Sequence, residues 1–353
     1  MRGSPLSNEM SLGTAQGRKL LLKRIWQYRW VYLVMVLPTL LLTVVFRYLT
    51  LPGVALAFMS FKPIYGAEYV YEGPAFLKWL ATFLHAASPA NLFNYLSSSK
   101  FVGMEHFARL MSESNFRTAF LNTIIISLLK LAIAFPFPIL LSLMLNEVYF
   151  KGFKRVLQTV FTFPHFLSWV VVAGIMLNLL GDTGAIKKLF LYLIPSIGDS
   201  WNVLYDPDIF RFELIFSEMW KEGGWGTILY LGAMAGIDPA LFEAATIDGC
   251  GRIKKIFYVT LPSILPIIII MFLLNVGNMV NANFDQVFNL YTPQTYATGD
   301  VIDTYIYRLA FQSSTVNDYG FTTAVGLFKS VINFVLLVGA NSLAKWFGSE
   351  GIM

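Results

Sequence analysis

The chain of 353 residues is poor in charge, with only 13% charged residues, while 56% of it is hydrophobic. A soluble protein of this length needs more charge than this to cover its surface. The low charge therefore excludes an ordinary soluble enzyme. Several apolar runs of nearly 20 residues indicate an integral membrane protein instead.

Cysteine and histidine are also scarce. The single Cys250 excludes an internal disulfide, and His85, His106 and His165 are scattered without metal-ligand spacing. The sequence has no G-x-x-x-x-G-K-[ST] phosphate loop, no H-E-x-x-H and no G-x-S-x-G. We therefore expect no catalytic site, metal or cofactor in this chain, and any energy for work must come from another protein.

Six apolar segments predict an all-α, multi-pass membrane protein with six transmembrane helices. The predicted spans cover about 30–49, 116–145, 156–180, 212–235, 264–284 and 323–343. The fourth span is the least regular, because charged residues and glycines interrupt it: Glu218, Lys221, Glu222, Gly223, Gly224 and Gly226.

Basic residues gather in the segments that six spans place on one side of the membrane, which is the side that faces the cytoplasm. They are Arg18, Lys19, Lys23, Arg24, Arg29, Lys151, Lys154, Arg155, Arg252, Lys254 and Lys255. The opposite loops carry acids: Asp182, Asp199, Asp206, Asp208, Asp285, Asp300, Asp303 and Asp318. This bias predicts two cytoplasmic termini and explains the basic pI without nucleic acid. The first 25 or so residues lack a cleavable signal-peptide pattern.

The segment between the fourth and fifth spans predicts a short helix. Asp238 and Pro239 suit an N-cap and the first helical position, and Gly249 and Gly251 end the helix. Leu241, Phe242, Ala245 and Ile247 are expected to form its apolar side. Such a helix suits docking in a groove of another protein, although an ordinary interfacial loop helix has a similar pattern.

The residues Glu243-Ala244-Ala245, Gly249 and Val259-x-Leu261-Pro262 resemble the EAA loop of binding-protein-dependent ABC importer permeases. That family has E-A-A, a glycine four residues on, nine further residues and I-x-L-P, so only the valine departs from its pattern. The first span with Pro38 and the stretches 284–291, 299–305 and 324–333 resemble the polysaccharide and oligosaccharide permease branch. The similarity covers nearly the whole chain.

The resemblance implies the transmembrane domain of a type I ABC importer, similar to the maltose and molybdate permeases. It implies a cytoplasmic tail over 1–29, a first helix and extracytoplasmic segment over 30–115, a core over 116–345 and a tail over 346–353. The core would hold five helices and a coupling helix at about 238–250. The residues that the family pattern assigns to ATPase coupling are Glu243, Ala244, Ala245, Asp248, Gly249, Leu261 and Pro262.

The same resemblance implies the partners. Two cytosolic ATPase subunits would bind ATP and Mg and move the coupling helices. A second permease subunit, more often a different chain than an identical one, would complete the pathway. An extracytoplasmic solute-binding protein would deliver an oligosaccharide or polysaccharide fragment across the bacterial cytoplasmic membrane.

Polar residues within spans favour a substrate pathway. Asn275, Asn278 and Asn281 recur every three residues on one helical face, and their amides can bond sugar hydroxyls. Rings that can stack on sugars are Trp220, Trp225 and Tyr230. Alternatively, the asparagines bond neighbouring helices.

Three lysines lie within the spans: Lys130, Lys221 and Lys329. They would suit an acidic saccharide, but pairing with Glu218 or Glu222, or snorkelling to an interface, explains them equally well. A stand-alone secondary transporter remains an alternative function, and it predicts membrane-depth carboxylate pairs and inverted repeats. A membrane-embedded enzyme would need a convergent His, Asp or Cys site.

Overall fold

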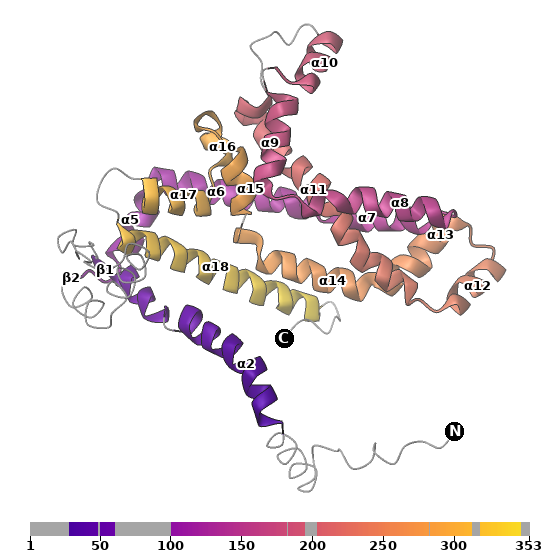
Figure 1. Cartoon of the computed structure of the whole chain (residues 1–353), viewed down its shortest axis with the longest axis horizontal. Coiled ribbons are helices and arrows are strands. Elements are labelled where there is room, and N and C mark those ends of the chain that lie inside the picture. The colour runs from indigo at the N-terminus through magenta and orange to yellow at the C-terminus, as the bar shows by residue number, and fades with distance from the viewer. Residues whose placement is uncertain are drawn as a thin grey trace. The chain divides into compact units, whose positions relative to one another are not determined.

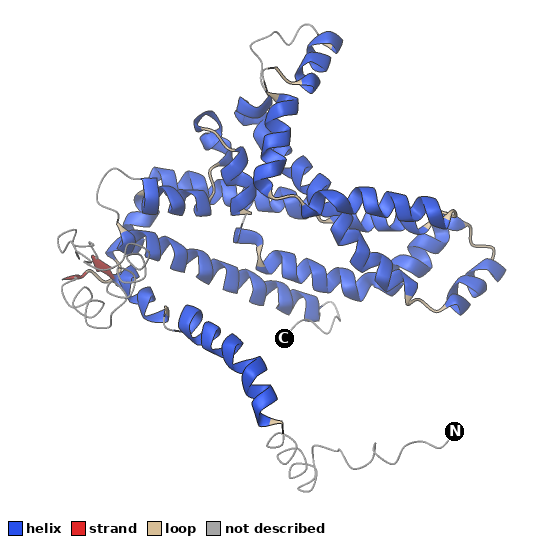
Figure 2. Ribbon diagram, in the orientation of Figure 1, coloured by secondary structure: helices blue, strands red, loops and turns tan. Residues whose placement is uncertain are grey.

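The computed structural model describes residues 28–48, 50–60, 100–181, 183–194, 203–281, 283–312 and 318–346, which are almost entirely helical (Figures 1 and 2). The chain divides into two compact units, Met1–Ala55 and Leu56–Met353. Several charges used for the predicted orientation lie outside the described residues: Arg18, Lys19, Lys23, Arg24, Asp182 and Asp199.

The first unit contains the first predicted span. Helix α2 (Arg29–Thr43) is continued by the π turn η1 (Val44–Tyr48), and the 3-10 helix η2 (Leu51–Phe58) runs from the first unit into the second. The described side chains of α2 are exposed on every side, which suits a helix surrounded by lipid rather than one with a single buried face. Pro38 lies inside α2, and membrane helices tolerate proline better than soluble ones do.

The second unit begins with short elements. The two-residue strands β1 (Met59–Ser60) and β2 (Lys100–Phe101) pair antiparallel, with Met59 opposite Phe101. Helix α5 (Glu105–Ser112) follows. The His106 ring nitrogen Nε2 lies 3.0 Å from the Met59 carbonyl oxygen, and Arg109 donates to Asp318 at 2.7 Å. These bonds tie α5 to β1 and to the start of the last helix.

The second predicted span consists of α6 (Ser114–Leu129), the π turn η4 (Lys130–Ala134) and α7 (Pro136–Asn146). Proline has no backbone N–H, so Pro136 begins a new helical segment. The Phe135 amide instead reaches back five residues to the Lys130 carbonyl, at 2.9 Å. This bond widens the helix locally and sets the position from which the Lys130 side chain departs.

The third predicted span, 156–180, is not one helix. It divides into α8 (Lys151–Thr162), the 3-10 turn η5 (Phe163–Phe166) and α9 (Trp169–Leu180). Pro164 lies within the break, and Ser168 caps α9 by accepting a hydrogen bond from the Val171 amide at 3.3 Å. Helix α10 (Ala185–Leu193) and the turn η7 (Val203–Tyr205) follow.

The fourth predicted span is longer and more regular than its sequence suggested. Helix α11 (Pro207–Ala235) has 29 residues without a break. It packs against α7 and α8 (Figure 1). A side chain at Gly224 would overlap the backbone of Phe161 and Thr162. The glycines of α11 therefore permit close helix packing instead of ending the helix.

The fifth predicted span, 264–284, ends earlier than expected. Helices α12 (Pro239–Ile247) and α13 (Arg252–Lys255) and the π turn η8 (Ile256–Thr260) precede α14, which runs Leu261–Gly277. Short segments follow: η9 (Met279–Asn281), α15 (Phe284–Leu290), η10 (Pro293–Thr295), α16 (Tyr296–Gly299), α17 (Ile302–Tyr307) and η11 (Arg308–Gln312). The last helix, α18 (Tyr319–Trp346), packs against α14.

Among the described residues, five segments are long and apolar enough to cross a membrane, and α11 with α12 forms a sixth if this pair, bent by 73°, counts as one span. The α11 sequence carries several charges, which lowers its mean hydropathy. Three buried apolar clusters hold the second unit together. One of them, around Ile139, Tyr230, Met234 and Ile264, joins α7, α11 and α14.

Candidate functional site

Helix α12 is a short helix with well-formed ends. Asp238 Oδ1 accepts a hydrogen bond from the Ala240 amide at 2.9 Å, and Pro239 occupies the first helical position. At the other end, Gly249 has a φ of 74°. The Gly249 amide donates to the Thr246 carbonyl at 3.1 Å and the Cys250 amide to the Ala245 carbonyl at 2.9 Å. This pair of bonds is the Schellman motif, which needs a left-handed residue.

Most side chains of α12 face outward. Ala245 is its one buried residue, whereas Glu243, Ala244 and Asp248 are exposed and Ile247 is 87% exposed. The apolar side expected from the sequence is therefore split, because Leu241 and Ile247 are exposed while Phe242 is half-buried. An exposed isoleucine at a short, rigidly capped helix is available for contact with another protein.

The residues Leu261 and Pro262 lie apart from α12, at the first turn of α14. Leu261 packs against the cluster that contains Tyr230, Met234 and Ile264. On the other side, Lys255 Nζ donates to Thr246 Oγ1 of α12 at 2.6 Å. Through these contacts, α13, η8 and α14 connect α12 to the helices that surround the cavity described next.

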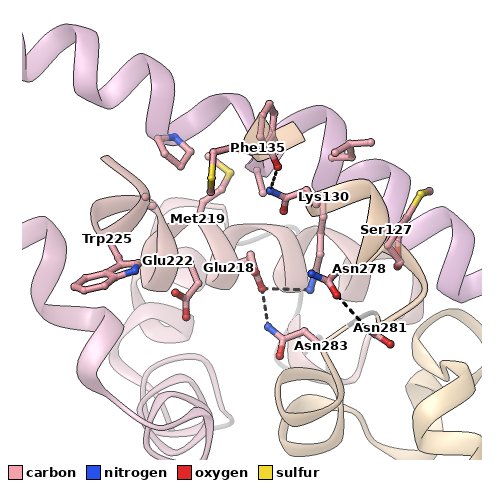
Figure 3. Close-up of a pocket in the computed structure, with 18 of the residues that line it drawn as sticks. Ser127, Lys130, Phe135, Glu218, Met219, Glu222, Trp225, Asn278, Asn281 and Asn283 are labelled. Atoms are coloured by element: carbon pink, nitrogen blue, oxygen red, sulfur yellow. Dashed lines mark hydrogen bonds and ion pairs between the residues drawn. The ribbon is translucent and has the colours of Figure 1, made fainter. Parts of the chain in front are cut away.

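A cavity of about 490 Å³ lies between the second span, α11 and α14 (Figure 3). Its walls combine apolar side chains with amides, carboxylates and one lysine. The polar residues of its lining are Ser127, Lys130, Glu218, Glu222, Asn275, Asn278, Asn281 and Asn283. This size and mixed lining are typical of a site for a small polar ligand.

Glu218 lies at the centre of a polar network on the wall of this cavity. Lys130 Nζ donates to Glu218 Oε2 at 3.2 Å, and Asn283 Nδ2 donates to the same oxygen at 3.1 Å (Figure 3). Lys130 also donates to Gln286, whose amide nitrogen donates to Ser217 Oγ at 2.8 Å. The network joins η4, α11 and α15, and it satisfies a half-buried lysine and the buried Gln286 amide together.

A second charged group adjoins the same wall. Lys221 Nζ donates to Glu222 Oε1 at 2.6 Å and to the His165 carbonyl at 3.1 Å. The His165 ring nitrogen Nδ1 lies 2.6 Å from Glu222 Oε2, and the His165 ring stacks on Trp225 with centroids 4.5 Å apart. The break between α8 and α9 therefore positions His165 against the wall that Glu222 and Trp225 form.

The three asparagines predicted for the pathway all line the cavity. Asn275 Nδ2 donates to the Met271 carbonyl at 2.8 Å, and Asn278 Nδ2 donates to the Leu274 carbonyl at 3.2 Å. These bonds run back along α14, from Asn275 inside it and from Asn278 at its C-cap, and among the described residues neither amide bonds another spanning helix. Asn281 differs, because Asn333 Nδ2 of α18 donates to its Oδ1 at 3.4 Å.

The predicted aromatic residues divide between two environments. Trp225 and Tyr230 line the cavity. Trp220 is half-exposed and does not belong to the described residues that line it. Sequence reasoning missed Ser127, Gln286 and His165. The sequence signal for this region was Lys130, a lysine within an apolar run. Its partner Gln286 lies 156 residues further along the chain, so no local pattern connects the two.

The intramembrane lysines are paired, as one of the two sequence interpretations expected. Lys130 pairs with Glu218 and Lys221 with Glu222. Lys329 pairs with a different carboxylate, since its Nζ lies 2.5 Å from Asp303 Oδ1.

Comparisons with known proteins agree with this geometry. The family model of the binding-protein-dependent transport system inner membrane component matches residues 134–348. The polygalacturonan/rhamnogalacturonan transport system permease protein YteP of Bacillus subtilis (strain 168) is 34% identical over 336 residues, 95% of this chain and 94% of that protein. The protein LplB of the same organism is 36% identical, over 92% of this chain and 91% of that protein.

Two solved structures share the fold. One is a bacterial ABC transporter involved in the import of the acidic polysaccharide alginate, with a TM-score of 0.74, 34% identity and coverage of 92% of this chain and 98% of that chain. The other is the bacterial alginate ABC transporter in complex with an alginate pentasaccharide-bound periplasmic protein. It has a TM-score of 0.75 and 33% identity, and the match covers 94% of this chain and 99% of that chain.

Proposed function

The chain belongs to the family of binding-protein-dependent transport system inner membrane components, and from this premise we propose how its two sites act together. It is a multi-pass permease subunit of an ATP-driven sugar importer. Its substrate is an oligosaccharide or polysaccharide fragment delivered by an extracytoplasmic solute-binding protein. The cavity beside Glu218 is one half of the pathway, and α12 is the coupling helix.

We place α12 on the cytoplasmic side, where two ATPase subunits dock on it. The support is its exposed Ile247, its fixed ends and its basic neighbours Arg252 and Lys254, since cytoplasmic loops are rich in lysine and arginine. Glu243 and Ala244 then face the docking partner. Both termini lie on this side as well.

ATP and Mg act at the partner subunits. Closure of the two ATPases would displace α12, and the contacts of Lys255 with Thr246 and of Leu261 with the Tyr230 cluster would carry that displacement to α11 and α14. Those helices form two walls of the cavity. A second permease, most often a different chain in such sugar systems, would supply the facing half of the pathway.

The single observation that carries the pathway assignment is the row of Asn275, Asn278 and Asn281 along a cavity that Trp225 and Tyr230 also line. Amides offer both donors and acceptors to hydroxyl groups, and the rings offer flat apolar faces. The stand-alone secondary transporter is not supported, because the carboxylates of this cavity are occupied by lysine or histidine partners.

The test is purification of the chain with its partner subunits from cells that carry the complete importer. We expect an ATPase to co-purify and Glu243→Lys to abolish uptake, because it reverses the charge of an exposed side chain at the docking surface. The variant should still insert in the membrane in normal amount. Uptake by Glu243→Lys at the wild-type rate would contradict the coupling role of α12.

A further inference from the structure

A second cavity of about 490 Å³, shallower and more open than the first, adjoins it at the end of α14. Its walls come from η9, α15, α17 and η11, and Asn281 and Asn283 line both cavities. The two cavities therefore adjoin at these two asparagines. On the proposed orientation, the second cavity lies toward the side from which the solute-binding protein delivers the sugar.

Aromatic rings form a continuous series along this second cavity. The Phe284 and Phe288 rings stack with centroids 5.0 Å apart, Phe288 contacts Tyr307 at 4.8 Å and Tyr307 contacts Phe311 at 5.3 Å. Phe284, Tyr307 and Phe311 line the cavity, and Phe311 is 73% exposed. A row of ring faces beside amides and a carboxylate suits a ligand with both an apolar face and hydroxyl groups, as a pyranose has.

The charges of the two cavities decide which sugar fits. Lys130, which lines the first cavity, is paired with Glu218, and Asp303, which lines the second, is paired with Lys329. Asp285 lines the second cavity and has no ion-pair partner among the described residues. A uronate unit would bring a further negative charge to this carboxylate, whereas a neutral sugar can donate its hydroxyl hydrogens to it.

We propose that the second cavity is an additional saccharide subsite that takes an uncharged sugar unit, stacked on Tyr307 and Phe311 and hydrogen-bonded to Asp285. This proposal rests on the proposed function and adds two properties to it. The pathway takes a chain long enough to occupy both cavities, and it selects neutral over acidic units at the outer position. The named alginate and polygalacturonan systems transport acidic polymers, so the selectivity differs from theirs.

The experiment offers a mixed pool of neutral galacto-oligosaccharides and oligogalacturonates of two to six units to cells that carry the complete importer. Mass spectrometry follows the depletion of each fragment from the medium. We expect the wild type to remove neutral fragments in preference to uronates. Phe311→Ala and Tyr307→Ala should each raise the half-saturation concentration about tenfold for fragments of three units or more, with a smaller change for the disaccharide.

Phe334→Ala is the matched control, because Phe334 is 64% exposed and is not among the described residues that line either cavity. It should leave every half-saturation concentration unchanged. Asp285→Lys should increase uptake of oligogalacturonates relative to neutral fragments. Because Phe311 is exposed, its removal should not lower the amount of complex in the membrane.

The outcomes separate the two proposals. A wild type that removes no saccharide from the pool and co-purifies with no ATPase would contradict the proposed function itself. Preferential removal of oligogalacturonates, or an unchanged half-saturation concentration in both aromatic variants, would overturn the second subsite alone. If Phe311→Ala reduces the amount of assembled complex without changing the half-saturation concentration, the surface is a contact between subunits and the subsite is likewise excluded.

Discussion

Lys130 Nζ lies 3.2 Å from Glu218 Oε2, so the one lysine among the described residues that line the first cavity contacts a carboxylate from another helix. Lys130 is the first residue of the π turn in the second span, and Glu218 lies in α11. The side chains are 14% and 22% exposed, so both charges are largely withdrawn from water and each stabilises the other.

Removing one member of this pair should lower the free energy of unfolding more than removing both. We expect Lys130→Met to destabilise the protein by about 2 kcal/mol, because it leaves Glu218 partly buried without its counter-ion. The double variant Lys130→Met with Glu218→Met should recover most of that loss. Thermal unfolding in detergent measures both, and a double variant that loses as much stability as Lys130→Met would contradict this penalty for an unpaired Glu218.

The close packing of α11 gives a second prediction. Gly224→Ala places a methyl group against the backbone of Phe161 and Thr162, so the two helices must separate. We expect a loss of about 1–3 kcal/mol. Gly232→Ala, on the same helix with open space around it, is the control and should be neutral or slightly stabilising. Unfolding midpoints that agree for the two variants would contradict this packing.

The amides of α14 give a third prediction. Among the described residues, the Asn275 and Asn278 side chains bond carbonyls of α14 and, for Asn278, the adjacent Asn281, so their removal should affect substrate more than structure. Asn275→Ala with Asn278→Ala should raise the saccharide concentration that half-stimulates ATPase activity in the assembled complex by about tenfold. Asn178→Ala is the control, since Asn178 bonds the Gly174 carbonyl of its own helix in the same way outside the cavity. If the double variant needs the same saccharide concentration for half-stimulation as the wild type, the two amides do not contact substrate.

Gly249 gives a fourth prediction. Its φ of 74° is unavailable to proline, and proline would also lose the amide that bonds Thr246. Gly249→Pro should therefore displace the end of α12 and abolish uptake, while Gly249→Ala should only reduce it, at a cost of about 1 kcal/mol. The amount of each variant in the membrane is the control, and normal uptake by Gly249→Pro would exclude a role for this end of the helix.

The parts of the fold that follow from local sequence were predictable. The cap residues Asp238 and Gly249 defined α12 within a few residues, and apolar runs located α6, α7 and α18. The break in the third predicted span was missed because apolar residues continue across Pro164, from Phe161 and Phe163 to Phe166 and Leu167. Its signals were the proline itself and the capping residue Ser168.

The candidate site was predictable only in part. A polar spacing of three residues placed Asn275, Asn278 and Asn281 on one face, and the structure brings all three to the cavity. The meeting of Lys130 with Gln286 was not predictable, because 156 residues separate them and the folding of α15 toward α11 sets the contact. The aromatic wall of the second cavity arises from the same return of the chain after α14.

The measurement that most directly tests the account is the sidedness of α12. A Cys250→Ser protein with Ile247→Cys carries one thiol, at a position that is 87% exposed. Reaction with a membrane-impermeant maleimide shows from which side of the membrane this thiol is accessible. We expect this thiol to be labelled in inverted membrane vesicles, more slowly when the ATPase subunits are bound. In intact cells we expect no labelling of this thiol. Labelling of Ile247→Cys from outside intact cells would contradict the account, since no cytosolic ATPase can then contact this helix.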